Sequence, residues 1–136
     1  MVSFSKIRRL RERGFTLVEL MIVISIIAIL LAVAIPNYTQ SIKHANESVL
    51  KQNLFTLRSS IDQYTLDKAK APQSLDELVS AGYLRVIPKD PITNAQDWVP
   101  VEDDSLMSAD QTAPGISDVH SASQATASDG TTYASW

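Results

Sequence analysis

An apolar run of 21 residues, from Phe15 to Ile35, constrains this chain more than any other feature of its sequence. At about 1.5 Å per residue, a helix of this length extends about 30 Å, which matches the hydrocarbon core of a bilayer. A helix in lipid satisfies its backbone hydrogen-bonding groups internally, so we predict a transmembrane helix over residues 15–35. One carboxylate, Glu19, lies inside the run, where lipid makes charge costly.

The residues before the run are basic and indicate its orientation. The first 14 residues contain five Lys and Arg residues and a single acid, Glu12. Because Lys and Arg next to a span stay in the cytoplasm, we expect the remaining chain to face outward, into a periplasm or its equivalent. From Phe15 onward there are seven basic and fourteen acidic residues, which argues against nucleic-acid binding.

Two other interpretations of the apolar run are an ordinary secretory signal peptide and a plain single-span anchor. A small-x-small cleavage pattern, Ala32-Val33-Ala34, lies just before Pro36. The run is longer, however, than the apolar region of about 7–15 residues that is usual in a secretory signal. A carboxylate has no purpose in a segment that is removed, and a plain anchor also leaves Glu19 unexplained.

A helical pattern continues beyond the predicted membrane span. Pro36 lacks a backbone donor, so it should kink or loosen the helix without ending it. We expect the helix to end near residues 68–71, before Pro72. Its apolar stripe predicts one face packed on a sheet. The stripe consists of Ile42, Val49, Leu50, Leu54, Leu57, Ile61 and Tyr64.

The remainder of the chain predicts short elements. The stretch SLDE, from Ser74 to Glu77, has the pattern of a capping box that opens a short helix, and Gly82 would end it. Strand-like segments follow at residues 98–101, 115–119 and 131–136. The predicted fold class is therefore α+β, with a long N-terminal helix, half transmembrane and half amphipathic, packed on a small C-terminal antiparallel sheet.

The stretch RGFTLVEL, followed by the apolar run and Pro36, resembles the class III signal of type IV pilins and pseudopilins. The resemblance implies that a prepilin peptidase cleaves after Gly14 and methylates the new amino terminus at Phe15. The apolar helix is retained, and Glu19 becomes the fifth residue of the mature chain. The implied organisation is a leader at 1–14, an assembly helix at 15–35 and a pilin-like periplasmic headpiece at 36–136.

Cleavage would also supply a partner for Glu19. The new amino group of Phe15 lies about one helical turn away, in the same helix or in a neighbouring subunit. In a low-dielectric medium, a neighbour that is out of register leaves two charges unpaired. The pair would therefore set the axial stagger between subunits.

The C-terminal part resembles the major pseudopilin of type II secretion systems. The resemblance rests on YLRVIPKDPITNAQDWVPV, GISDVHSAS and DGTTYASW. It implies a structural subunit, not an enzyme, that polymerises into a pseudopilus and helps to push folded substrates through the outer membrane. Implied partners are other copies of the chain, minor pseudopilins, an inner-membrane assembly platform and the prepilin peptidase. The alternatives are a type IV pilus subunit for adhesion, motility or DNA uptake, and a membrane-anchored binding domain that never polymerises.

Major pseudopilins carry calcium in a C-terminal loop, and the resemblance therefore implies a candidate calcium site here. By position its ligands would be Asp118 and Asp129, with an oxygen from Ser121, and the acidic run 102–104 could add ligands. The stretch between the two aspartates lacks the glycine- and acid-rich spacing of calcium-bound members, so solvated loop aspartates are the alternative. His44 and His120 have no catalytic or metal-binding spacing, and the chain has no cysteine.

Overall fold

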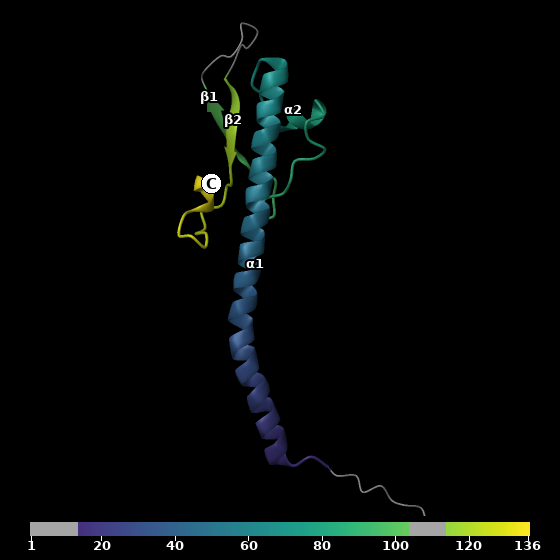
Figure 1. Ribbon diagram of the computed structural model, residues 1–136, viewed down its shortest axis with the longest axis vertical. Helices are drawn as coiled ribbons and strands as arrows, with labels where there is room; N and C mark the ends of the chain where they lie inside the picture. Colours follow the sequence, from purple (N-terminus) through teal and green to yellow (C-terminus); the bar gives the residue numbers. More distant parts are fainter. Residues whose placement is uncertain (1–13, 104–113) are drawn as a thin grey trace, which may run out of the picture. The chain divides into compact units, whose positions relative to one another are not determined.

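The computed structural model describes residues 14–103 and 114–136, and these form two compact units that divide between Thr39 and Gln40. Helix α1 (Leu17–Lys68) passes from the first unit into the second (Figure 1). Most of the predicted leader and Asp104 lie outside the described residues.

Helix α1 is continuous through Pro36, as predicted. The hydroxyl of Thr39 donates a hydrogen bond to the carbonyl oxygen of Pro36 (2.9 Å). The helix ends at Lys68, inside the predicted range, and Ala69 then adopts a left-handed conformation with φ of 54°. A single left-handed residue after the last helical turn is a common way for a chain to leave a helix.

The buried face of α1 follows a stricter spacing than the predicted stripe. Its buried residues are Glu47, Leu50, Leu54, Leu57, Ser60, Ile61 and Tyr64. Ile42 and Val49 were included in the stripe, and this was wrong, because both side chains are exposed. Neither position is among the buried residues from Glu47 to Tyr64, which follow one another mostly at steps of three and four. A carboxylate, Glu47, occupies the N-terminal end of that face.

Helix α2 (Leu75–Ser80) begins as the SLDE pattern predicts, although only half of the capping box forms. Ser74 is the N-cap, and its hydroxyl oxygen accepts a hydrogen bond from the amide of Glu77 (3.3 Å). The Glu77 carboxylate accepts hydrogen bonds from the amide of Gln73 (2.7 Å) and the hydroxyl of Tyr64 instead of returning to Ser74. Gly82 follows the helix with φ of 86° and ends it, as expected.

Strands β1 (Val99–Asp103) and β2 (Gly115–His120) pair in an antiparallel, two-stranded sheet. The register skips Ser117, which is a β-bulge opposite the Val101–Glu102 bond. Because an extra residue shifts the alternation of side chains, Ile116 and Val119 both face the core although they are three residues apart. Every residue of β1 is exposed, and the strand contains Pro100, as an edge strand can.

The third predicted strand, at residues 131–136, was wrong. This segment forms a single isolated bridge, Thr126 to Thr132, and then a 3₁₀ turn, Tyr133–Ser135. Gly130, with φ of 87°, reverses the chain directly before it. The amide of Tyr133 then donates to the carbonyl of Ala125 (3.1 Å), after which the chain curls instead of extending along β2. We refer to residues 121–136 as the C-terminal loop.

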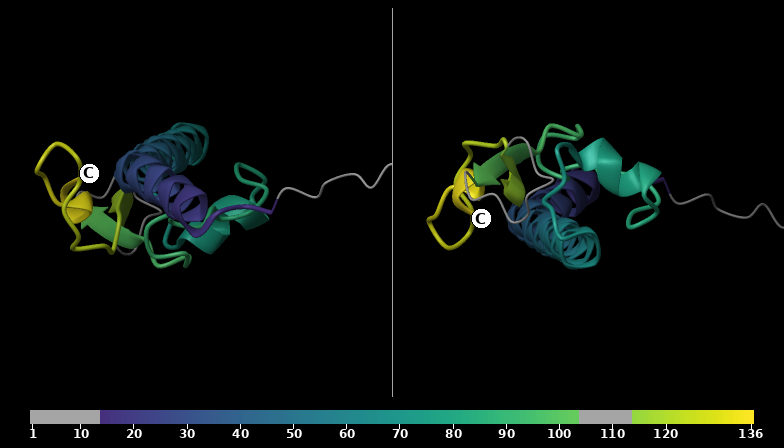
Figure 2. Two further views of the ribbon diagram at one scale, coloured as in Figure 1. Left: turned by 90° about the horizontal axis from the view of Figure 1, so that it is seen from below. Right: turned by 90° about the horizontal axis from the view of Figure 1, so that it is seen from above.

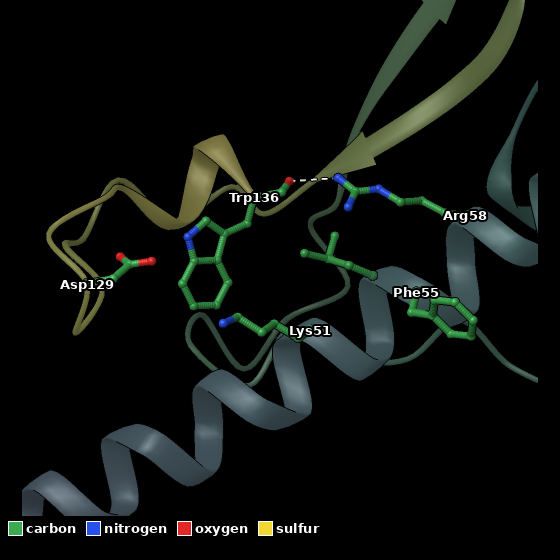
Figure 3. Close-up of a pocket in the computed structure, with 6 residues that line it drawn as sticks. Lys51, Phe55, Arg58, Asp129 and Trp136 are labelled. Atoms are coloured by element: carbon green, nitrogen blue, oxygen red, sulfur yellow. Dashed lines mark hydrogen bonds between the residues drawn. The ribbon is translucent and has the colours of Figure 1, made fainter.

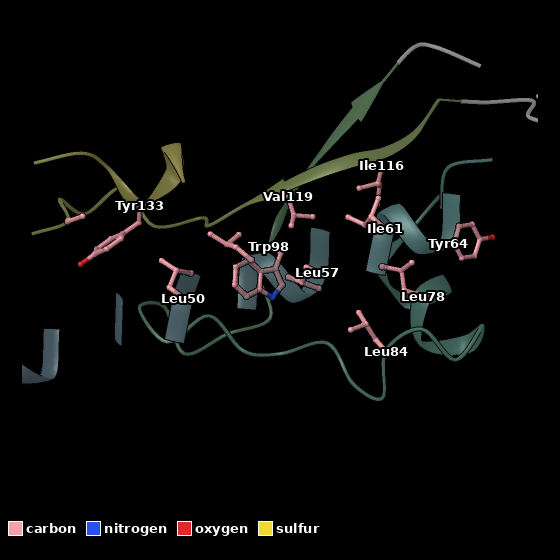
Figure 4. Close-up of a cluster of buried hydrophobic side chains, with 12 residues drawn as sticks. Leu50, Leu57, Ile61, Tyr64, Leu78, Leu84, Trp98, Ile116, Val119 and Tyr133 are labelled. Atoms are coloured by element: carbon pink, nitrogen blue, oxygen red, sulfur yellow. The ribbon is translucent and has the colours of Figure 1, made fainter. Parts of the chain in front are cut away.

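A single hydrophobic core joins these elements within the second unit. Figure 4 shows side chains of α1 meeting those of α2, the sheet and the C-terminal loop, and Figure 2 shows these segments around the helix from two ends. The predicted α+β class, a long helix packed on a small antiparallel sheet, is confirmed. The core residues are Leu50, Leu54, Leu57, Ile61, Tyr64, Leu78, Leu84, Trp98, Ile116, Val119, Ala127 and Tyr133.

Candidate functional sites: the apolar helix and the C-terminal loop

The first half of α1 presents an apolar surface on all sides. None of the residues in its most apolar window of 18 residues is buried, and the helix is long and apolar enough to cross a membrane. Leu17 and Ile29 are 77% and 66% exposed. Because so large an apolar surface is unfavourable in water, it requires lipid or other helices around it.

Glu19 lies in the first turn of this helix, and Thr16 precedes the turn as its cap. The Thr16 hydroxyl accepts a hydrogen bond from the amide of Glu19 (3.1 Å). Thr16 and Glu19 thus have the Thr-x-x-Glu spacing of a capping box, a signal that is present in the sequence although no cap was predicted there. Within the described part of the chain, the Glu19 carboxylate has no hydrogen-bond or ion-pair partner.

Gly14 and Phe15 lie just before this helix. Residues 14–16 have no regular secondary structure and are exposed. No atom lies within 4 Å of the position that a Cβ of Gly14 would occupy. The Gly14–Phe15 bond is therefore in an exposed segment without regular secondary structure, the kind of segment that peptidases cleave.

The two candidate calcium ligands belong to different hydrogen-bond networks. Asp118 on β2 accepts a hydrogen bond from Arg58 Nε through Oδ1 (2.5 Å), and the same oxygen accepts from the amide of Val119 (2.7 Å). Asp129 in the C-terminal loop accepts from the amide (2.9 Å) and the hydroxyl (2.6 Å) of Thr131. These bonds from Thr131 lower the pKa of Asp129. Among the described residues no group of three or more acidic or histidine side chains could hold a metal ion.

Ser121, the third candidate ligand, is buried and directed elsewhere. Its hydroxyl donates to Oδ2 of Asp90 (2.5 Å), and Asp90 is fully buried. The other oxygen of Asp90 accepts from the amide of Ile92 (2.7 Å) and so closes the turn after Pro88. Asp90 was not predicted as a structural carboxylate, although an Asp-Pro pair in a turn-rich segment is a recognised signal for one.

Glu47 on α1 is a second buried carboxylate that was not predicted from the sequence. Its Oε1 accepts three hydrogen bonds, from the amide (2.8 Å) and hydroxyl (2.8 Å) of Ser128 and from the hydroxyl of Tyr133 (2.9 Å). Burial, the largest single influence, raises the pKa of Glu47, but the bonds from Ser128 and Tyr133 outweigh it and leave the pKa below its ordinary value. Burial and the bond to Glu47 raise the pKa of Tyr133 to about 12.

The C-terminal loop and α1 also line a pocket of about 350 Å³ that is open to the surface. Figure 3 shows Lys51 and Arg58 on the helix side and Trp136 and Asp129 on the loop side. The ammonium of Lys51 lies 4.5 Å from the ring centroid of Trp136, which is a cation–π distance.

The two histidines contact acidic residues but form no catalytic or metal cluster in the described ranges. His44 Nδ1 lies 3.5 Å from Glu47 Oε2, and His120 Nε2 lies 3.7 Å from Asp118 Oδ2. His120 Nδ1 also lies 2.5 Å from the main-chain oxygen of Trp136.

The chain is similar to a known family and to several known proteins. Residues 9–35 match the family model described as the prokaryotic N-terminal methylation motif. Type II secretion system core protein G of Klebsiella pneumoniae is 35% identical over 97 residues, which cover 60% of this chain and 69% of that protein. The protein of the same name from Escherichia coli K12 is 32% identical over 100 residues, covering 62% and 69%.

A relative with a different name matches a shorter stretch. Competence protein ComGC of Halalkalibacterium halodurans is 38% identical over 73 residues, which cover 54% of this chain and 72% of that protein. No solved structure matches the chain significantly.

Proposed function

Since this chain belongs to the type IV pilin and pseudopilin family, which includes type II secretion system core protein G, we propose that it is a structural subunit of a type II secretion pseudopilus. It acts by assembly and is not an enzyme. Copies polymerise through their N-terminal helices into a periplasmic filament that helps to push folded substrates through the outer membrane.

The observation that carries this proposal is the exposed apolar half of α1 with the Glu19 carboxylate in its first turn. The apolar surface accounts for residence in the inner membrane before assembly and for helix packing afterwards. Glu19 then requires a cation at the same depth, and the amino group of Phe15 on a neighbouring copy is one. The pair sets the axial register, while apolar packing supplies most of the cohesion.

We further propose the processing and the partners that this assembly requires. A prepilin peptidase cleaves after Gly14 on the cytoplasmic side and methylates Phe15, which leaves residues 15–35 as the assembly helix and residues 36–136 as the periplasmic headpiece. Pro36 loosens the helix at the membrane exit. Minor pseudopilins and an inner-membrane assembly platform complete the machine.

Mass spectrometry of the mature protein from cells that contain a prepilin peptidase tests the processing. We expect an amino terminus at N-methylated Phe15. Retention of the leader, or a start near Ile35 as from an ordinary secretory signal, would contradict the proposal.

Neutralisation of Glu19 tests assembly. We expect Glu19→Gln to be inserted in the membrane at the level of the wild type but to lose the ladder of cross-linked multimers, because the neighbouring amino group has no counter-ion. The matched control is Glu102→Gln, which neutralises an exposed glutamate on β1. Equal ladders for both variants would instead indicate a single-span anchor that does not polymerise.

The similarity to competence protein ComGC supports a second candidate, a type IV pilus subunit for adhesion, motility or DNA uptake. Both candidates use the same assembly chemistry and differ in the filament that is assembled, a periplasmic pseudopilus or a surface pilus. Deletion of the gene separates them: loss of exoproteins from the medium supports the pseudopilus, and loss of DNA uptake, motility or adhesion with normal secretion supports the pilus.

A further inference from the structure

The C-terminal loop is attached to α1 through two charged side chains, Glu47 and Arg58. They are eleven residues apart, close to three helical turns, so they lie on the same face of the helix. Glu47 binds the middle of the loop, and Arg58 binds its end. Their partners in the C-terminal loop are 78–86 residues away in the sequence, so these contacts fix the loop on the helix.

Glu47 holds both sides of the turn at Gly130. Ser128 precedes this turn and Tyr133 follows it, and both donate to the same oxygen, Oε1 of Glu47. Glu47 and Tyr133 are only 7% and 2% exposed, so water competes little for these bonds. A carboxylate that accepts several hydrogen bonds in a buried place is a strong attachment, because charge-assisted bonds are stronger than neutral ones.

The polarity of this attachment is opposite to that of a calcium site. Calcium collects oxygen acceptors around a positive charge. Here the loop directs one amide and two hydroxyl donors at a negative charge, Glu47. The amide of Ser128 has no lone pair to offer a cation, so this part of the loop is built to meet an acceptor.

Arg58 supplies the positive charge at the other end of the loop. Its Nε donates to Asp118, and its Nη2 donates to the main-chain oxygens of Val119 (2.9 Å) and Trp136 (2.8 Å), the latter drawn in Figure 3. One carboxylate and two main-chain oxygens are a set that calcium also uses. In this protein the guanidinium of Arg58 donates hydrogen bonds to these oxygens.

The residues present do not fit calcium. Asp118 is paired with Arg58, Ser121 donates to Asp90, and the pocket that Asp129 lines contains the two cations Lys51 and Arg58. Across residues 14–103 and 114–136, every buried side-chain nitrogen and oxygen already has a hydrogen-bond partner within the protein. We propose that Glu47 and Arg58 close the C-terminal loop in place of a metal ion, and that this loop is calcium-independent.

Thermal unfolding of the full chain in mild detergent tests independence from metal. We expect the Tm in excess EDTA and in millimolar CaCl₂ to agree within about 1 °C, whereas a saturated ligand site shifts the Tm of a domain of this size by several degrees. Amide exchange of loop peptides, measured by mass spectrometry, should likewise be the same in both solutions.

The same exchange measurement on variants tests the two side chains. Glu47→Ala leaves the Ser128 and Tyr133 donors without their acceptor, so we expect loop amides to exchange about tenfold faster or more. Arg58→Met should accelerate exchange at the loop end. Glu102→Ala, at an exposed acid on β1, is the matched control and should leave exchange unchanged.

Two results would overturn the proposal. One is calcium-dependent protection or stabilisation of the wild-type loop. The other is loop exchange in Glu47→Ala that equals that of Glu102→Ala. If Glu47→Ala does not fold, Tyr133→Phe decides by the same readout, because it removes one donor to Glu47 and keeps the buried ring.

Discussion

At the scale of single residues, a few charged side chains determine where distant segments attach. Glu47 and Arg58 on α1 fix the C-terminal loop, and Asp90 fixes the turn after Pro88 to Ser121. Each of these side chains has several partners, so removing it leaves several polar groups unsatisfied at once. The free energy of folding lost in this way exceeds that lost with a single exposed ion pair.

The first prediction concerns pH. Because the pKa of Glu47 is lowered on folding, its ionised form contributes stability that is complete above its ordinary pKa of 4.5 and is lost as the pH falls through the lower folded value. His44, Ser128 and Tyr133 are the groups that face this carboxylate. Urea unfolding of the wild type and Glu47→Gln should show a stability difference that is constant above pH 5 and shrinks in acid. A difference that grows in acid would contradict the assignment.

The second prediction concerns Gly115 at the start of β2. A Cβ at this position would lie 2.4 Å from Cβ of Ala71 and 3.0 Å from its main-chain carbon and oxygen. Gly115→Ala should therefore destabilise the fold by about 1–3 kcal/mol, as overpacking does. In a double-mutant cycle measured by urea unfolding, Ala71→Gly should restore part of the loss. Full additivity of the two changes would show that the contact is not the cause.

The contacts of single side chains were the feature hardest to predict from the sequence. Asp118 and Asp129 were assigned to one candidate site by position, yet they accept hydrogen bonds from different donors, Arg58 and Thr131 respectively. Glu47 could have been found, because it continues the three- and four-residue spacing of the buried face of α1. Its partners could not, because they lie 81 and 86 residues away and have no local pattern.

At the scale of elements, local signals predicted most boundaries. The apolar period, the end of α1 near Lys68 and the start of α2 at Ser74 all depend on neighbours within a few positions. The strands β1 and β2 were also located, but residues 131–136 were not a strand. Whether a short segment extends or curls depends on a distant partner, which here is Glu47, 86 residues from Tyr133.

The third prediction concerns the cap of α2. Ser74→Ala removes the side-chain oxygen that accepts from the amide of Glu77, so we expect a loss of about 1 kcal/mol. Ser80→Ala, at the other end of the same helix, is the control. Its hydroxyl donates back to the carbonyl of Asp76, so its loss should change stability by less. Thermal unfolding of the two variants should therefore rank Ser74→Ala as the less stable, and the reverse order would refute the cap assignment.

At the scale of the whole molecule, the two units differ in where their apolar side chains lie, exposed in the first and buried in the second. None of the described residues up to Thr39 is buried, whereas Gln40–Trp136 contains the complete hydrophobic core. The first unit therefore depends on its surroundings for stability, and the second depends on its own packing.

The fourth prediction follows from this division. A chain that begins at Gln40 should fold alone and unfold in one cooperative transition, because it retains every core residue. Circular dichroism during heating and dispersed methyl signals in NMR spectra would check this. A chain with a broad, non-cooperative transition would show instead that the first 39 residues are needed for the fold.

The three hydrogen bonds on one oxygen of Glu47 have a consequence for how new copies mature. If Glu47 and Arg58 close the loop as proposed, each copy completes its fold without taking up an ion from the medium. The amount of folded protein should then be the same at low and at high calcium concentration in the medium.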